Sequence, residues 1–101
     1  DVCSSDLVLG RPAHGKEIHN STMVSTALSW MRGGMTNVRT NQALSDGINT
    51  LSKLRPDVQG MANGLIHIAE VNVSGGPSYH AAREILFRKI LGPRFGSYLP
   101  L

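Results

Sequence analysis

The segment RPDVQGMANGLIHIAEVN, residues 55–72, decides how this chain folds. It consists of two short apolar runs separated by Asn63-Gly64, and an Asn-Gly pair in that position is the strongest local signal for a two-residue hairpin turn. The sequence therefore predicts two antiparallel strands with a tight turn between them. The predicted strands cover residues 54–61 and 65–73.

Two acidic side chains are the main chemical feature of this hairpin. Asp57 follows Pro56 in the first strand, and Glu70 lies near the end of the second. Side chains alternate along a strand, so Asp57 shares a face with Gln59 and Glu70 shares a face with Asn72, and the carboxylates can meet across the hairpin. Two such carboxylates are typical ligands of Mg²⁺, which leaves its other positions to water and substrate phosphate.

The remaining elements follow from spacing and from turn residues. Residues 16–32 carry apolar side chains at three- and four-residue spacing and end at Gly33-Gly34, which predicts a helix. Ser78 follows a Gly-Gly-Pro break and can cap a second helix over 78–91. Short strands are predicted at 38–41, at about 48–51 within the turn-rich connection 42–53, and at 96–101. This order predicts an α/β fold in which two helices flank a small mixed sheet.

Composition limits the classes of protein that need to be considered. With 101 residues the chain suffices for one domain with a small core. Its net charge of +3 favours an anionic partner such as nucleic acid, although a basic surface serves plain solubility equally well. No apolar run is long enough to span a membrane, and no signal peptide is recognisable.

The first seven residues, DVCSSDL, resemble a translated sequencing-adapter remnant, and we set them aside from fold reasoning. Without Asp1 and Asp6, ten basic residues stand against five acidic ones, a net charge of +5. The only cysteine, Cys3, is set aside with them, which excludes a disulfide framework and a cysteine zinc site. Residues 8–15 are predicted to be a linker and residues 16–101 a single domain. We expect this domain to be the tail of a longer protein.

Pro56-Asp57 and Glu70 resemble the signature of the nuclease superfamily written PD-(D/E)xK, in which Asp and Glu hold a metal ion and a Lys assists the attacking water. The predicted element order is similar to the αβββαβ core of that superfamily, the restriction-endonuclease-like fold. The chain departs from the signature at Asn72, where the superfamily has Lys. Because this Lys migrates to neighbouring elements in the superfamily, the resemblance implies that Arg83 or Lys89 supplies the missing charge.

A closer resemblance, over about residues 17–92, is to the C-terminal toxin domains of Rhs-type and other bacterial polymorphic toxins. The segments that carry it are RTNQ (39–42), RPDVQ (55–59), Asn63-Gly64, the strand of Glu70 and GPSYH (76–80). In those domains the strand after the turn commonly reads Glu-x-Asp, so Asn72 replaces a carboxylate. The resemblance implies a secreted bacterial effector that acts as a nuclease in the cytoplasm of a target cell, with a cognate immunity protein as partner.

These observations together give an expected site for metal-dependent hydrolysis of nucleic acid, with DNA favoured. The expected ligands of Mg²⁺ or Mn²⁺ are Asp57, Glu70 and Glu17, the last because the superfamily often places a third acid on the first helix. The expected catalytic residues are Asp57, Glu70, Asn72 and His80. The residues expected to hold phosphates by charge are Arg55, Arg83 and Lys89.

Plainer interpretations of the same residues stay open. Asp57 is also a common turn residue, and a carboxylate in an apolar strand, such as Glu70, needs either a partner or a water-facing edge. Two other functions compete with the metal-dependent nuclease. Asn72 is compatible with a non-catalytic nucleic-acid-binding or interaction module of the same fold. A metal-free ribonuclease would instead use His19 or His80 as its base.

Overall fold

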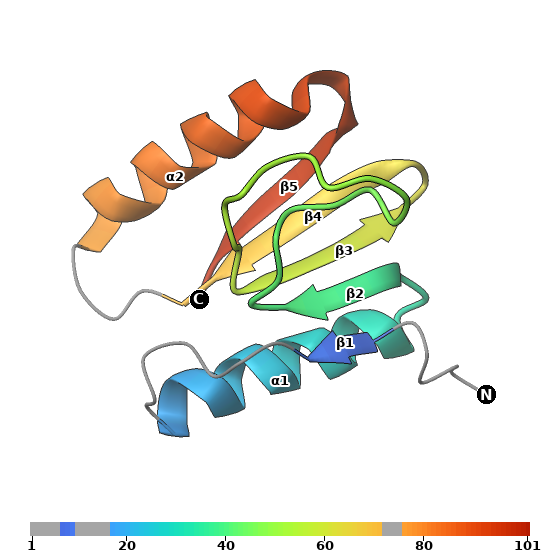
Figure 1. Ribbon diagram of the computed structural model, residues 1–101. Coiled ribbons are helices and arrows are strands. Elements are labelled where there is room, and N and C mark those ends of the chain that lie inside the picture. Colours follow the sequence, from blue (N-terminus) through green and yellow to red (C-terminus); the bar gives the residue numbers. More distant parts are fainter. Residues whose placement is uncertain (1–6, 10–16, 72–75) are drawn as a thin grey trace.

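The computed structural model of the chain describes residues 7–9, 17–71 and 76–101 (Figure 1). From the second element onward the chain order is αβββαβ, so the predicted α/β fold class is confirmed. Among the described residues, no helix has the length and apolar character needed to cross a membrane. The elements are β1 (Leu7–Leu9), α1 (Glu17–Arg32), β2 (Thr36–Thr40), β3 (Val58–Ala62), β4 (Leu65–Glu70), α2 (Gly76–Leu91), a short 3-10 helix (Gly92–Arg94) and β5 (Phe95–Pro100).

The five strands form one mixed sheet in the order β1-β2-β3-β4-β5. β3 runs antiparallel to both β2 and β4, whereas β1 pairs parallel with β2 and β5 pairs parallel with β4. The ends of β2, β4 and β5 therefore meet the beginning of β3. The register pairs Thr40 with Val58, Val58 with Ala69, and Glu70 with Pro100. We call this end of the sheet the carboxyl edge.

The hairpin between β3 and β4 has the predicted tight turn. Asn63 and Gly64 both have positive φ, 55° and 78°, as a type I′ turn requires. The ladder runs from Val58 opposite Ala69 to Ala62 opposite Leu65. β3 begins later than the predicted residue 54, because Leu54 bonds the loop instead: its carbonyl accepts the N–H of Leu44 at 2.9 Å.

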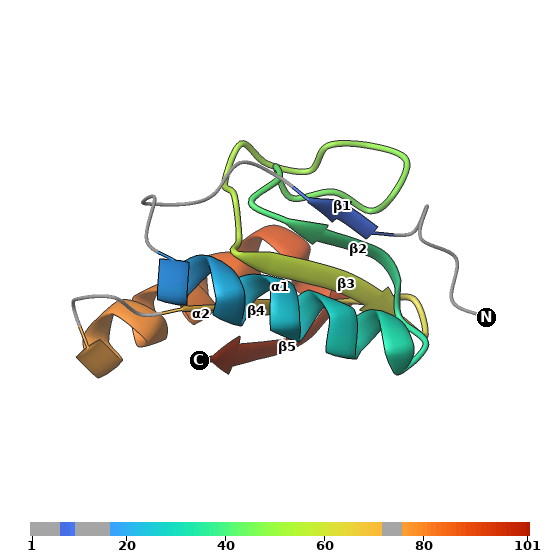
Figure 2. The same cartoon turned by 90° about the horizontal axis from the view of Figure 1, so that it is seen from below.

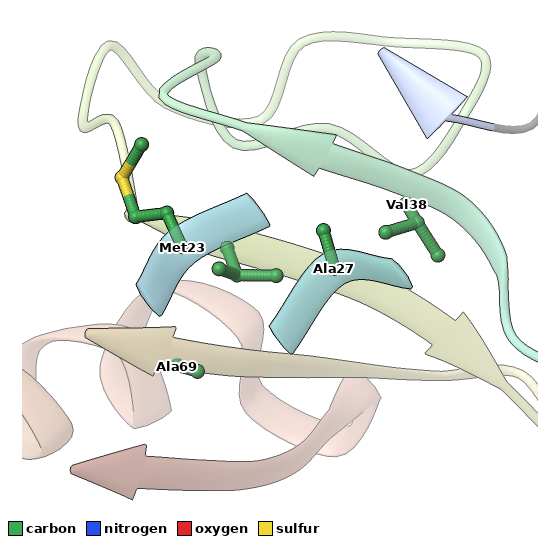
Figure 3. Close-up of a cluster of buried hydrophobic side chains, with 5 residues drawn as sticks. Met23, Ala27, Val38 and Ala69 are labelled. Atoms are coloured by element: carbon green, nitrogen blue, oxygen red, sulfur yellow. The ribbon is translucent and has the colours of Figure 1, made fainter. Parts of the chain in front are cut away.

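α1 covers one face of the sheet, along β2 and β3. Met23 and Ala27 of the helix face Val38 of β2 and Ala69 of β4, and all four are buried (Figure 3). Val58 completes this cluster. Since side chains alternate along a strand, the burial of Val58 and Ala69 against α1 directs the residues next to them toward the opposite face.

The opposite face is covered by α2 and by the long loop between β2 and β3. Phe87 and Leu91 of α2 pack with Ile66 and Ile68 of β4, and Leu44 of the loop completes the buried cluster. Figure 2 shows the loop and α1 on opposite sides of β2 and β3. The two helices thus pack on opposite faces, with the loop as additional cover for the half of the sheet that α2 does not reach.

The loop is fixed by a buried amide. Gln59 is 1% exposed, and its Oε1 accepts the N–H of Ser45 at 3.0 Å while its Nε2 donates to the carbonyls of Gln42 and Ala43. These three hydrogen bonds make Gln59 a structural residue.

The strand predicted at about residues 48–51 does not form. The strand pairing of this part of the loop is limited to an isolated bridge between Ser45 and Thr50.

The beginning of the domain also differs from the boundary expected from sequence. Leu7–Leu9 pair with Val38–Thr40 as a parallel edge strand, although residues 1–7 were set aside and 8–15 were expected to be a linker. The reason is that β2 exposes an edge whose backbone groups the apolar run 7–9 can satisfy. The rest of the expected linker, residues 10–15, lies outside the described residues.

Gly60 in β3 offers a test of the packing between the sheet and α1. A Cβ at this position would lie 3.1 Å from Sδ of Met35 and 3.2 Å from the indole of Trp30, both tighter than ordinary contacts. We expect Gly60→Ala to lower the free energy of unfolding by about 1–3 kcal/mol, because overpacking forces these neighbours to move. Urea denaturation followed by the fluorescence of Trp30, the only tryptophan, measures the change.

Gly33→Ala is the matched control. Its Cβ would meet only backbone oxygens of Trp30 and Ser29, at 3.4 and 3.5 Å, which are ordinary contacts. We expect a change within about 0.5 kcal/mol for this variant. A Gly60→Ala variant as stable as Gly33→Ala would contradict the tight packing of α1 on β3.

Candidate functional site

The carboxylate of Glu70, the last residue of β4, is the centre of a buried polar cluster. Glu70 is 1% exposed. Arg83 of α2 donates from Nε to Oε1 at 2.9 Å and from Nη2 to Oε2 at 2.8 Å, and the hydroxyl of Tyr98 in β5 donates to Oε1 at 2.9 Å. A buried carboxylate is costly unless its charge is paired and its oxygens are hydrogen-bonded, and here both conditions are met.

Topology explains why these three side chains meet. β5 runs parallel to β4, and Tyr98 lies opposite Ile68, so its ring is directed to the face that carries Glu70. The chain leaves β4 at the carboxyl edge and returns as α2, which packs on the sheet face opposite α1 (Figure 1). Arg83 of α2 therefore reaches Glu70 from this face. The guanidinium also lies over the ring of Phe87, 5.0 Å from its centroid.

Asp57 lies beside Glu70 at the carboxyl edge. It immediately precedes Val58, the partner of Ala69, and is therefore at the next position of the ladder opposite Glu70. The side chain is largely buried, and its Oδ2 accepts the N–H of Val71 at 2.8 Å. The two carboxylates thus lie at the ends of neighbouring strands, as the hairpin pattern predicted.

Tyr79, in the first turns of α2, is within electrostatic reach of both carboxylates. Burial raises the pKa of its hydroxyl most, Glu70 raises it further, Arg83 partly offsets this, and Asp57 raises it again. Asp57 and Glu70 are next to Val58 and Ala69, which pack against α1, so alternation along the strands directs both carboxylates to the face covered by α2. The ring remains 39% exposed and is the most accessible aromatic group of the cluster.

His80 joins the cluster through Tyr98. Its Nδ1 lies 2.8 Å from the hydroxyl oxygen of Tyr98, and its ring packs edge-on against both Tyr98 and Tyr79. Its Nε2 is buried and has no hydrogen-bond partner within the described part of the chain. His80 therefore lies in the site that the sequence predicted for it, held from one side by a tyrosine.

Tyr98 is the functional candidate that the sequence did not reveal. Burial raises its pKa most, followed by the charge of Glu70 and the hydrogen bond to it. The parallel pairing of β4 with β5 places Tyr98 two residues from the partner of Glu70. The sequence shows that Tyr98 is a tyrosine in the last predicted strand. It does not show that this strand pairs with the strand of Glu70, so the contact between the two residues is not predictable from it.

Two of the other expected site residues, Lys89 and Arg55, are not in this cluster. Lys89 is exposed in the last turn of α2, the end far from the carboxyl edge. Arg55 is exposed and donates to the carbonyl of Asn41 next to that edge. Glu17 and His19 are in the first turn of α1, and their side chains, like the whole of Asn72, lie outside what the structure describes.

The acidic residues of the cluster supply two carboxylates for a metal ion. No group of three or more His, Cys, Asp and Glu residues that could hold a metal occurs among residues 7–9, 17–71 and 76–101. Oxygen donors of two carboxylates suit a hard cation such as Mg²⁺ or Mn²⁺. Arg83 already neutralises one of them, so a cation that binds Glu70 must compete with a bidentate guanidinium.

No family model, curated protein or solved structure matches this chain. The likeness to PD-(D/E)xK nucleases and to polymorphic toxin domains therefore stays a prediction. The chemistry of the site is inferred from the contacts of its own residues.

The first test of the cluster is the ionisation of its tyrosines. The chain has two, Tyr79 and Tyr98, and both have pKa values raised above the ordinary value of about 10. We expect the tyrosinate absorbance of the folded protein to stay low at pH 10, whereas protein unfolded in urea shows half-ionisation there. Because the unfolded state loses these protons first, the stability that they contribute is complete below pH 10 and lost as pH rises further.

Tyr98→Phe identifies the source of the signal, because it leaves Tyr79 as the only tyrosine. A folded wild type that ionises both tyrosines at about pH 10 would contradict the buried network.

Arg83→Gln tests whether the charge of Glu70 depends on its counter-ion. We expect the free energy of unfolding to fall by about 3–5 kcal/mol in urea, because the change leaves a buried carboxylate without a counter-charge. Arg88→Gln is the control on the same helix, since Arg88 is exposed, pairs with the partly exposed Glu84 and lies over the ring of Phe95, 4.5 Å from its centroid. That variant should lose about 1 kcal/mol or less, because the ion pair and the cation–π contact are both exposed to solvent. Equal losses in the two variants would show that the buried charge of Glu70 does not depend on Arg83.

Proposed function

We propose that this domain is a nuclease that hydrolyses phosphodiester bonds, with DNA as the favoured substrate and with Mg²⁺ or Mn²⁺ bound by Asp57 and Glu70. The observation that supports this most is the position of Asp57 and Glu70 at the adjoining ends of neighbouring strands, with Arg83 bound to Glu70. In metal-assisted phosphodiester hydrolysis, the protein supplies carboxylates that hold the metal ion and a basic side chain that offsets charge on the phosphate. In this proposal Glu17 remains the candidate third acid.

The residues have distinct roles in the proposed site. Asp57 and Glu70 would hold the ion, which when bound lowers the pKa of a water molecule and offsets negative charge on the scissile phosphate. Arg83 forms an ion pair with Glu70, and in the proposal it supplies the positive charge that Asn72 does not. Its guanidinium fork matches a phosphate as well as a carboxylate, so it can serve either partner.

Arg83 is thus proposed as the substitute for the missing Lys. Of the two basic residues of α2 considered for that role, Arg83 contacts Glu70, whereas Lys89 is in the last turn of the helix. In this proposal, Arg55 and Lys89 attract the phosphates of the nucleic-acid backbone more weakly, because salt screens exposed charges. The proposed biological setting is a secreted bacterial effector that acts in the cytoplasm of a target cell and is neutralised by an immunity protein.

A metal-free nuclease that uses His80 is the second candidate. It is favoured by one observation, the buried Nε2 of His80 that finds no partner among the described residues. A neutral imidazole can take a proton from a nucleophile near pH 7, and Arg83 would then stabilise the phosphate. The two candidates differ in their need for metal, which makes them separable by experiment.

The test is digestion of plasmid DNA and of RNA by the purified protein with Mg²⁺, with Mn²⁺ or with EDTA. We expect cleavage with metal and none with EDTA, and loss of at least about 100-fold in rate for Asp57→Asn and Glu70→Gln, since metal ligands supply several kcal/mol of transition-state stabilisation. Millimolar metal should also raise the melting temperature of the wild type but not of Asp57→Asn.

Glu84→Gln is the matched control, because Glu84 is a partly exposed carboxylate of α2 that pairs with Arg88. It should cleave at the wild-type rate. Cleavage that persists in EDTA would favour the histidine mechanism. A folded wild type that cleaves neither nucleic acid under any condition would refute the nuclease proposal and favour a binding module.

A further inference from the structure

The hydrogen atoms of the polar cluster can be assigned from its donors and acceptors. Glu70, bound by both nitrogens of the Arg83 fork, is a carboxylate and can only accept. The hydroxyl of Tyr98 has one hydrogen, and at 2.9 Å from Oε1 it must donate that hydrogen to Glu70. The oxygen of Tyr98 is then left as an acceptor for His80.

This assignment decides the tautomer of His80. Nδ1 of His80 lies 2.8 Å from the Tyr98 oxygen, so Nδ1 must carry the hydrogen. The reverse arrangement, in which Tyr98 donates to His80, would place the lone pairs of the hydroxyl and of the carboxylate against each other at 2.9 Å. In the neutral ring, the second nitrogen, Nε2, therefore carries a lone pair and no hydrogen.

Nε2 is also the buried side-chain polar atom that has no hydrogen-bond partner among residues 7–9, 17–71 and 76–101. It is buried, and no described residue donates to it. A buried acceptor without a donor is energetically unfavourable, and such atoms are typical of catalytic positions or of sites that bind a donor. The edge-on packing of the ring between Tyr79 and Tyr98 fixes the direction in which this lone pair points.

We propose that Tyr98 is a positioning residue that, backed by Glu70, holds His80 in its Nδ1–H tautomer, so that Nε2 accepts the proton of the attacking water. This rests on the proposed nuclease function and adds a Glu70–Tyr98–His80 relay to it. Nε2 takes one proton from water while the water oxygen forms the new bond to phosphorus. The ester P–O bond breaks, its electron pair leaves with the ester oxygen, and that oxygen takes a proton from solvent.

The relay resembles a general design in which a carboxylate orients a histidine through its Nδ1–H, with Tyr98 inserted between the two groups. The role of the relay is to fix the ring of His80 and to stabilise the positive charge that forms when Nε2 is protonated. Tyr98 does not contact the reacting atoms in this scheme. Glu70 consequently has two functions, as the carboxylate of the proposed metal site and as the anchor of the relay.

The tautomer can be measured without any activity. Long-range proton–nitrogen correlation spectra of ¹⁵N-labelled protein at pH 8, where free imidazole is neutral, distinguish a protonated from a bare ring nitrogen. Among the four histidines, the signal of His80 is the one lost in His80→Asn, and that of His67 is the one lost in His67→Gln. We expect His80 to show Nδ1–H and a bare Nε2, and to change toward Nε2–H in Tyr98→Phe. His67, which contacts Ser97, is the internal control and should not change.

His80→Asn separates catalysis from structure. The Asn amide can replace Nδ1–H as a donor to Tyr98 but has nothing at the position of Nε2, so the contact is kept and the proton acceptor is lost. We expect a folded variant whose cleavage rate falls by about 10²- to 10⁴-fold, the usual contribution of a general base. Tyr98→Phe should lose about tenfold or more, because the wrong tautomer prevails.

Three results would overturn the proposal: an Nε2–H tautomer in the wild type, an unchanged tautomer in Tyr98→Phe, or wild-type cleavage by His80→Asn. The last result would make the contact between Tyr98 and His80 structural only. If the wild type cleaves no nucleic acid, the proposed function fails and the role of Nε2 fails with it. The spectrum of the wild type still decides the tautomer assignment in that case, so the two failures are distinguishable.

Discussion

The buried charge of Glu70 is the constraint on which the rest of the structure depends. A carboxylate with 1% exposure cannot stay ionised without a counter-charge and full hydrogen bonding. Arg83 and Tyr98 provide both, one from α2 and one from β5. These contacts hold α2 and β5 to the carboxyl edge, whereas the buried apolar residues of α2, Phe87 and Leu91, lie toward its other end. The side chain of Glu70 therefore connects β4 with α2 and with β5.

The same constraint gives the cluster its chemical character. The carboxylate of Asp57, the fork of Arg83 and the imidazole of His80 are brought within one region because they surround Glu70 or its direct partners. Arg83 cannot leave Glu70 without another cation to replace it. In the proposed nuclease, a metal ion would be that cation, and its binding would be linked to stability through Glu70.

A second buried polar group, the amide of Gln59, performs the corresponding task for the loop between β2 and β3. Three hydrogen bonds from one side chain fix residues 42–45 against β3. The loop returns to the sheet at Asp57, so its anchoring also determines where that carboxylate lies. Apolar packing alone would not define this position, because contacts such as those of Leu44 are not directional, whereas hydrogen bonds are.

The sequence by itself determined the local elements and the pairing of β3 with β4. Asn63-Gly64 requires a tight turn, and the register that follows places Asp57 opposite Glu70, because both are short-range consequences of backbone geometry. Only the tertiary structure decided the partners of these acids. Arg83 and Tyr98 reach Glu70 from elements 13 and 28 residues farther along, and β1 joins the sheet from the opposite end of the chain. These long-range contacts depend on how separate helices and strands pack against one another, and no local pattern of residues encodes that packing.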